Sequence, residues 1–168
     1  MENIFGKDWS DYNNGYPLDD SDVARYISVT PSENQRRHQS KPFYCFIHFG
    51  MNTATAREWG TARETVKDFT IKSINARQWV SAIKNSGATG IILTCKHHDG
   101  FCLWQTKTTE HSIKNSPYKN GRGDVVKEVS DVCKKYGLKF GVYLSPWDRN
   151  AKCYGTPAYN HFYIEQLT

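Results

Sequence analysis

Three short runs of apolar residues dominate the hydrophobic pattern of the chain. They cover residues 43–48, 90–95 and 139–145, and each contains β-branched or aromatic side chains. The second run, opened by Gly90, is almost continuously apolar, which is typical of a strand covered on both faces. We therefore expect three strands at these positions.

A helical pattern separates the first strand from the second. After Asn75, a candidate N-cap, the residues Trp79, Val80 and Ile83 fall on one helical face, and Gly87 ends the pattern. The next strand follows within a few residues, a length typical of loops from helix to strand. This spacing predicts a helix over residues 76–86.

The same plan recurs later in the chain. Residues 124–136 carry one apolar stripe, and Gly137 follows. The stripe consists of Val125, Val129, Val132, Cys133 and Tyr136. A third helix is expected to start near Asn160.

The predicted order is therefore strand and helix, three times over. Strands that alternate with helices pair in parallel through right-handed crossovers. A closed barrel of eight such units takes roughly 250 residues, whereas this chain has 168. A small open α/β domain is one interpretation. We expect instead the first three βα units of a TIM-like (β/α)8 barrel, truncated, because three strands alone would leave two unpaired edges.

Two regions are expected along the chain. Residues 1–40 form an N-terminal lead-in, irregular except for one short helix beginning near Pro31, and residues 41–168 form the partial barrel. The loops over residues 49–74 and 99–123 are longer than usual. Both follow the carboxyl end of a strand, which is where βα-barrels build their active sites.

Polar residues gather at these strand ends. Lys96-His97-His98-Asp99 directly follows the second strand, and His48 ends the first. The carboxyl ends of parallel strands meet at one edge of the sheet, so we expect these side chains to converge. His97 and His98 would point in opposite directions in a regular strand. Both reach one pocket only if the strand ends or bulges there.

Two carboxylates near the same edge need separate interpretations. Asp99 precedes a glycine, and Asp-Gly is a turn sequence, so we expect it to fix the turn or the histidines by hydrogen bonds. Asp148 follows the third strand, and we expect it in a loop or at the rim of the pocket.

Composition and charge exclude some classes of function. The net charge of +5 comes from 22 basic and 17 acidic residues without a basic run interleaved with aromatics, so we expect no nucleic-acid partner. No apolar run approaches transmembrane length, and residues 1–20 lack the apolar core of a signal peptide, so we expect no membrane partner. A signal removed earlier would leave the compartment open. The five cysteines form no CxxC pair, and we expect free thiols that pack as small apolar residues.

Several motifs also occur in a characteristic order. They are Phe46-Ile47-His48-Phe49-Gly50-Met51-Asn52-Thr53, then Arg57-Glu58-Trp59-Gly60, then the segments 96–104, 121–126 and 140–150. Together they resemble the α-L-fucosidases of glycoside hydrolase family 29, from about residue 31 to the end of the chain. The segment 145–150, Ser-Pro-Trp-Asp-Arg-Asn, most resembles the branch that acts on α-1,3/1,4-linked fucose.

The resemblance implies a (β/α)8-like barrel and a retaining mechanism with two carboxylates. The family's nucleophile is an Asp in a Trp-Phe-Asp-Gly-like segment at the end of the fourth strand, and this sequence contains no such segment. The acid/base, further downstream in the family, is missing too. The resemblance thus places no catalytic residue in this chain, and we expect the chain itself to be inactive.

What the resemblance carries over is a substrate-binding shell for terminal α-L-fucose of an oligosaccharide or glycoconjugate. Its members are His48, Glu58, Trp59, His97, His98 and Tyr143. Their chemistry suits a sugar, because a neutral imidazole offers one donor and one acceptor to hydroxyls. A carboxylate accepts from two hydroxyls, and an aromatic ring provides a flat apolar wall.

Two other functions stay open. The first is a non-catalytic carbohydrate-binding or interaction protein derived from a fucosidase, which the missing nucleophile would favour. The second is a metal-dependent barrel hydrolase with His48, His97 and His98 as ligands, although the ligand spacing typical of such sites is lacking. We expect no metal and no cofactor.

Overall fold

A computed structural model describes residues 20–41 and 43–168. The chain divides into two compact units, Met1–Ser40 and Lys41–Thr168, and each is described by itself.

The first unit contains helices α1 (Asp20–Ile27) and α2 (Glu33–Gln39). Helix α2 begins near Pro31 as predicted, and Ser32 and Gln35 form a reciprocal capping box at its start. Helix α1 corrects the expectation of a single short helix. Its ends carry the charges that favour a helix dipole, with acidic residues in the first turn and Arg25 in the last. Neither helix buries a residue, and the apolar side chains of α1, Val23, Tyr26 and Ile27, are exposed.

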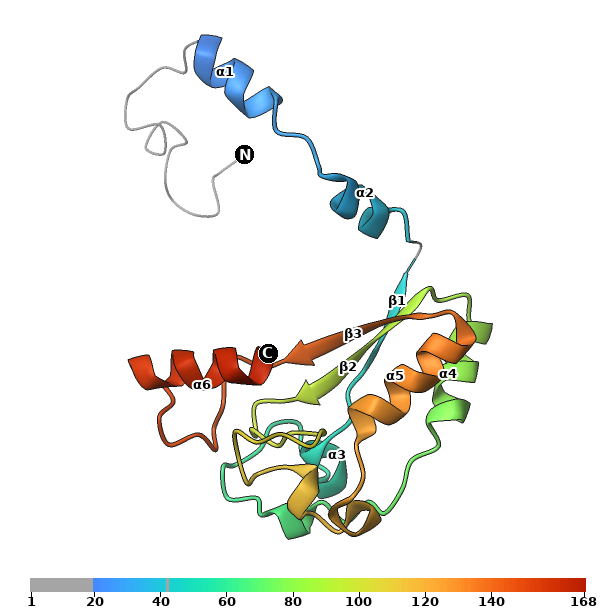
Figure 1. Ribbon diagram of the computed structural model, residues 1–168, viewed down its shortest axis with the longest axis vertical. Coiled ribbons are helices and arrows are strands. Elements are labelled where there is room, and N and C mark those ends of the chain that lie inside the picture. Colours follow the sequence, from blue (N-terminus) through green and yellow to red (C-terminus); the bar gives the residue numbers. More distant parts are fainter. Residues whose placement is uncertain (1–19, 42) are drawn as a thin grey trace, which may run out of the picture. The chain divides into compact units, whose positions relative to one another are not determined.

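The second unit is built on three parallel strands, as predicted (Figure 1). These are β1 (Tyr44–Ile47), β2 (Gly90–Lys96) and β3 (Lys139–Leu144), and β2 lies in the middle. The register aligns the first residues of the strands, with Tyr44 beside Gly90 and Gly90 beside Lys139. All three strands therefore bring their carboxyl ends to the same edge.

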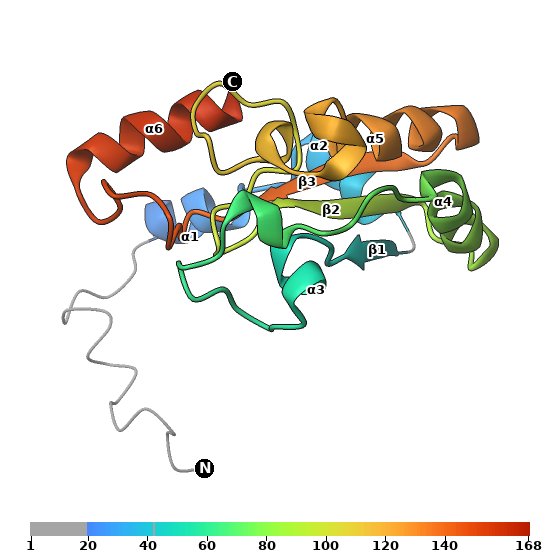
Figure 2. The same cartoon turned by 90° about the horizontal axis from the view of Figure 1, so that it is seen from below.

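Helices α4 (Ala76–Asn85) and α5 (Val125–Tyr136) lie side by side against the sheet (Figures 1 and 2). Both confirm the predicted helices, and Asn75 caps α4 as predicted, whereas the Asp124 cap of α5 was not predicted. The Asn75 side chain accepts a hydrogen bond from the Gln78 amide at 3.0 Å, and the Asp124 side chain accepts one from Lys127 at 2.8 Å. Gly137 ends α5 at φ +73°, a conformation that glycine adopts without strain.

The core forms where these helices meet β2. Ile91, Leu93 and Cys95 alternate along the strand and are buried, as are Val80 of α4 and Val129 of α5. Each such side chain contributes roughly 1.5–3 kcal/mol by its removal from water. The five cysteines are free, and Cys95, Cys102 and Cys133 are buried.

The long loops at the carboxyl edge have their own core. The loop after β1 holds α3 (Met51–Thr55) and the 3-10 turn η2 (Val66–Asp68), and the loop after β2 holds η3 (Ile113–Asn115) and η4 (Tyr118–Gly121). Phe69 stacks on Phe101 at 4.9 Å between ring centroids and contacts Tyr118 at 6.1 Å. Because all three rings are fully or nearly fully buried, the two loops pack on each other.

The last helix, α6, covers Pro157–Leu167 and begins earlier than the expected Asn160. Pro157 lies in its first turn, where the fixed φ of proline favours a helix start. The Tyr163 hydroxyl donates to the Leu144 carbonyl at 2.8 Å, which attaches α6 to the end of β3. Within the part of the chain that the structure describes, no helix has the length and apolar character needed to cross a membrane.

Candidate functional site

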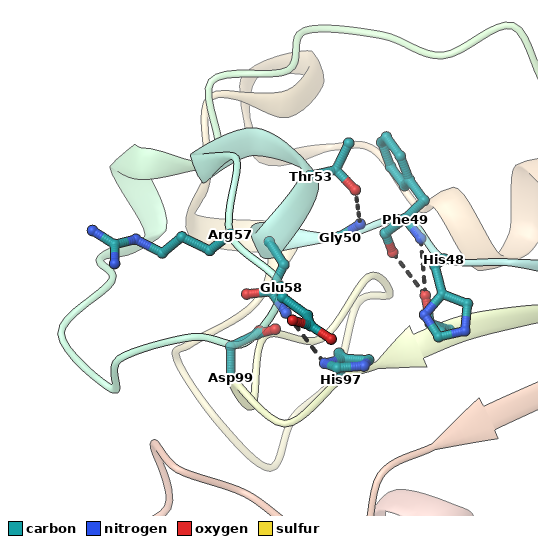
Figure 3. A pocket seen from close by; sticks show the side chains of 10 residues that line it. His48, Phe49, Gly50, Thr53, Arg57, Glu58, His97 and Asp99 are labelled. Atoms are coloured by element: carbon teal, nitrogen blue, oxygen red, sulfur yellow. Dashed lines mark hydrogen bonds between the residues drawn. The ribbon is translucent and has the colours of Figure 1, made fainter.

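A cavity of about 260 Å³ lies at the carboxyl edge of the sheet (Figure 3). It is slightly smaller than the roughly 300–1,000 Å³ of typical drug-sized ligand sites, so it suits a ligand about the size of one sugar. Three of the six predicted binding residues line it, namely His48, Glu58 and His97. Asn52, Arg57 and Asp99 line it as well.

His48 stands immediately after β1. The buried Thr94 hydroxyl of β2 accepts a hydrogen bond from the Phe49 amide at 3.0 Å and lies within 3.2 Å of the Ile47 carbonyl. These bonds fix the backbone on both sides of His48. Its ring lies 4.7 Å from the ring of Phe46 and 5.8 Å from that of His97.

His97 and His98 follow the end of β2, and their rings lie 4.3 Å apart. The strand ends at Lys96, and the pairing with β3 shifts register between Thr94 and Lys96. Both alternatives foreseen for bringing the two histidines together, a strand end and an irregularity, are thus present. The two rings lie side by side, but of the two only His97 lines the cavity, so the expectation that both reach one pocket stays a prediction.

Both imidazoles have depressed pKa values. Burial, followed by the neighbouring His98 and His48, lowers the pKa of His97 to about 4. Burial and then the charge of Arg149 lower the pKa of His98. A lowered pKa means that the neutral ring, with one donor and one acceptor, predominates at neutral pH.

Each of these histidines has a polar partner on a neighbouring loop. The Nδ1 atom of His97 lies 3.2 Å from the side-chain nitrogen of Asn52, in α3. The Nδ1 atom of His98 lies 2.6 Å from the Ser145 hydroxyl, which directly follows β3. The partner of His97 thus comes from the loop after β1, and the partner of His98 comes from the loop after β3.

Trp59 and Tyr143 surround this pair without lining the cavity. The Trp59 ring meets His98 edge-to-face at 6.1 Å and Trp147 at 5.8 Å, and the side chain is 54% exposed. The Tyr143 ring lies 6.2 Å from His97. Trp59 also borders a second, more polar hollow beside the cavity, which Arg57 shares. An exposed ring beside polar side chains can serve as the wall for one face of a sugar.

Arg149 connects the three loops around the cavity. Its guanidinium donates to the Gly60 carbonyl in the loop that carries Glu58, and it lies over the Trp147 ring at 5.4 Å. Its backbone amide donates to the His98 carbonyl at 2.9 Å. One residue therefore fixes the positions of the loops after β1, β2 and β3 relative to each other.

Asp99 has the turn role that the sequence suggested. One carboxyl oxygen accepts a hydrogen bond from the Phe101 amide at 2.8 Å, and Gly100 continues the turn at φ +79°. The other oxygen is buried and has no partner among the described residues. Burial, followed by the charges of Glu64 and Asp148, raises the pKa of Asp99 to about 6.

Asp148 lies in a loop, one of the two positions expected for it, and at 2% exposure it is buried. One oxygen accepts from the backbone amides of Asn150 and Ala151, and the other pairs with the Lys96 ammonium at 3.1 Å. Burial of a carboxylate is tolerated here because both oxygens have charged or amide partners.

Sequence reasoning missed two side chains that matter to the site. Asn52 lies within the Phe46–Thr53 motif, so the sequence placed it after the first strand. Its contact with His97 could not be read from the sequence. Lys96 begins the Lys-His-His-Asp motif, yet it is fully buried, and its ammonium also contacts Gln166 at 2.7 Å in α6. A lysine at the end of an apolar strand was the available signal for a buried charge.

The residues described here contain no group of three or more His, Cys, Asp or Glu side chains arranged to hold a metal ion. His48, His97 and His98 touch through their rings, and the Nδ1 atoms of His97 and His98 already face Asn52 and Ser145. The geometry offers hydrogen-bonding groups and aromatic walls, which suit a polyhydroxylated ligand.

The fold and this pocket define an α/β protein with a small cavity, lined by histidines and charged side chains, at the carboxyl edge of parallel strands. A sequence model for the family described as alpha-L-fucosidase matches residues 21–167, and the chain belongs to that family.

Individual relatives agree. The chain is 48% identical over 143 residues to Alpha-L-fucosidase 1 of Arabidopsis thaliana, an alignment covering 84% of this chain and 28% of the relative. The structure of a glycoside hydrolase 29 family member from a rumen bacterium is similar at 52% identity and a TM-score of 0.79, over 82% of this chain and 25% of the other. A Ruminococcus gnavus fucosidase of family 29, solved in complex with fucose, matches at 38% identity and a TM-score of 0.76, over 83% and 32%. The chain thus spans about a quarter to a third of the length of these relatives.

Proposed function

We propose that this chain forms the fucose-recognising part of a retaining α-L-fucosidase. In this proposal residues 41–168 are the first three βα units of a TIM-like barrel, and the complete site removes terminal α-L-fucose from fucosylated glycans. The observation that carries the proposal is the convergence of His48, Glu58 and His97 on one sugar-sized cavity. The fucose complex of the Ruminococcus gnavus relative supports the choice of sugar.

We assign the six residues the following roles. The imidazoles of His48, His97 and His98 exchange hydrogen bonds with sugar hydroxyls, and the Glu58 carboxylate accepts from two of them. Trp59 and Tyr143 supply aromatic surface against the apolar face of the ring. The segment 145–150 favours the branch of the family that acts on α-1,3/1,4-linked fucose, because it resembles that branch most.

The chain is expected to bind fucose but not to hydrolyse a fucoside. Retaining glycosidases need a nucleophile and an acid/base about 5 Å apart, and the segment that carries the family's nucleophile does not occur in these 168 residues. Binding and chemistry are therefore separable in this protein.

The test combines both measurements on the purified chain. L-Fucose binding is followed by calorimetry or NMR, with D-fucose as the mirror-image control, and hydrolysis is followed with an aryl α-L-fucoside. His48→Ala is expected to weaken L-fucose binding about fivefold, since one lost hydrogen bond is worth about 1 kcal/mol. His161→Ala, at an exposed position in α6, is the matched control.

The outcomes separate the readings. Equal binding of L- and D-fucose, or no binding at all, would contradict the assignment of the pocket. Turnover of the aryl fucoside by the chain would contradict the expected division between binding and catalysis. Detection of a native 19.3 kDa polypeptide that binds fucose without hydrolysing it would favour the carbohydrate-binding alternative.

A further inference from the structure

The adjacent histidines His97 and His98, of which His97 lines the cavity, are held by chemically different partners. His97 faces an amide nitrogen, that of Asn52, whereas His98 faces a hydroxyl, that of Ser145. An imidazole accepts through an unprotonated nitrogen and donates through a protonated one, so each partner determines where the ring proton lies.

The proton of His97 follows from Asn52. A side-chain NH2 group can only donate, so the Nδ1 atom of His97, 3.2 Å away, accepts. The single proton of the neutral ring is then on Nε2. Figure 3 shows the bond on one side of the His97 ring and the second nitrogen on the side away from it. The cavity is therefore lined by a ring whose free nitrogen is an N–H donor.

The proton of His98 follows from Ser145. The Ser145 hydroxyl donates its own proton to the Trp147 carbonyl at 2.8 Å and accepts from the Trp147 amide at 3.1 Å. Only one lone pair is left for His98, so the Nδ1 atom of His98, 2.6 Å away, must donate. Because Ser145 is fully buried, no water competes for this lone pair. The Nε2 atom of His98 is then unprotonated and an acceptor.

We propose that Asn52 and Ser145 are positioning residues that hold His97 and His98 in opposite tautomers. The two rings, 4.3 Å apart, then present one N–H donor and one bare nitrogen acceptor next to each other. Such a pair matches two neighbouring hydroxyls of a sugar, because one hydroxyl can accept from His97 while the other donates to His98. The recognition step rests on the proposed function, whereas the tautomers do not.

Neutral rings are required for this arrangement, and the site supplies them. Burial lowers the pKa of both histidines, the neighbouring His98 and His48 lower that of His97 further, and the charge of Arg149 lowers that of His98. The charged groups near the pair include Arg57, Glu58 and Asp99, which line the cavity with His97, and Arg149, which lies over the Trp147 ring.

The experiment reads the tautomers directly. In the chain labelled with 15N-histidine, long-range proton–nitrogen correlation spectra near pH 7.5 distinguish Nδ1–H from Nε2–H rings. We expect Nε2–H for His97 and Nδ1–H for His98, without any sugar added. The resonances are assigned with His97→Gln and His98→Gln.

Two variants test the cause. Asn52→Asp has nearly the same shape, but its carboxylate only accepts, so His97 should change to the Nδ1–H form. Ser145→Ala removes the acceptor, so His98 should lose its Nδ1–H preference, and Ser145→Thr should restore it. Ser130→Ala, in which the lost hydroxyl lies on α5 and bonds only the Lys127 carbonyl, should change neither ring. Dispersed amide spectra confirm that each variant is folded.

The sugar measurement completes the test. Asn52→Asp and Ser145→Ala should each weaken L-fucose binding about five- to tenfold, as expected for one reversed or lost hydrogen bond. An Nδ1–H form of His97, an Nε2–H form of His98, or unchanged tautomers in Asn52→Asp would overturn the proposal. If the tautomers are as expected but the variants bind L-fucose like the parent, the recognition step is refuted. A parent chain that does not bind L-fucose refutes the proposed function, and the NMR result still decides the tautomers.

Discussion

The buried ion pair between Lys96 and Asp148 offers the sharpest test of how the site is held together. The Lys96 ammonium is completely buried. It lies 3.1 Å from a carboxylate oxygen of Asp148, 2.7 Å from the side-chain amide oxygen of Gln166 and 3.4 Å from the Tyr159 hydroxyl. The Asp148→Asn variant keeps the oxygen that caps the loop but removes the counter-charge. An unpaired charge is then left in the interior.

The expected cost is large. Breaking a buried pair by removal of one partner typically destabilises a protein by about 3–5 kcal/mol. At a urea slope of about 2 kcal/mol per M, a loss of about 4 kcal/mol lowers the unfolding midpoint by about 2 M. Lys96→Met should also be costly, because it leaves a buried carboxylate. The double variant should cost less than the sum of both, since neither charge is then left alone.

Urea unfolding followed by tryptophan fluorescence and circular dichroism measures these midpoints. Lys127→Met and Asp131→Asn are the matched controls, because this pair on α5 has a similar contact of 2.7 Å but is exposed. Exposed pairs contribute little, so the controls should keep the parent midpoint. The reasoning is refuted if Asp148→Asn unfolds within about 0.5 M of the parent, or if the two single costs simply add in the double variant.

Two further predictions concern the loop beneath the pocket. The pKa of Asp99 is raised from 3.8 to about 6, so its contribution to stability is highest below about pH 4 and falls by roughly 3 kcal/mol as the pH rises through 6. The urea midpoint of Asp99→Asn relative to the parent should therefore increase from pH 4 to pH 7. A difference that stays constant with pH would mean that the pKa of Asp99 is not raised. His97 titrates in the opposite sense, but it is present in both proteins, so its effect cancels in this difference. Gly60→Ala should cost about 1–3 kcal/mol by overpacking, because a Cβ there would lie 2.6 Å from the Cβ of Asp99. Gly50→Ala, with nothing within 4 Å, is its control, and equal midpoints for the two variants would contradict the packing argument.

The elements of the second unit could be predicted because their signals are local. The stripe of α5, its Asp124 cap and its Gly137 stop all lie within fourteen consecutive residues, 124–137. Parallel pairing followed from the order of strands and helices alone. For His97 and His98 the sequence predicted only a condition, namely that both side chains can point the same way if the strand ends or bulges before them. In a regular strand they would point in opposite directions, and the end of β2 at Lys96 removes that constraint.

The burial of Lys96 was outside the reach of such reasoning. Its partners lie 52, 63 and 70 residues further along the chain, and no local pattern relates them. For the same reason Asp148 was expected at a loop or rim, although it is the buried counter-ion. The partners of a charge decide whether it can be buried, and they become known only when the loops are placed.

The pocket is held by contacts between successive βα units. Thr94 of β2 fixes the end of β1, the Ser145 amide donates to the Lys96 carbonyl at 3.0 Å, and Arg149 reaches back to Gly60. The second and third units thus each fix a strand end or loop of an earlier unit. Since these contacts lie within residues 46–149, the positions of the six proposed sugar-binding side chains depend on the first three units and not on a nucleophile.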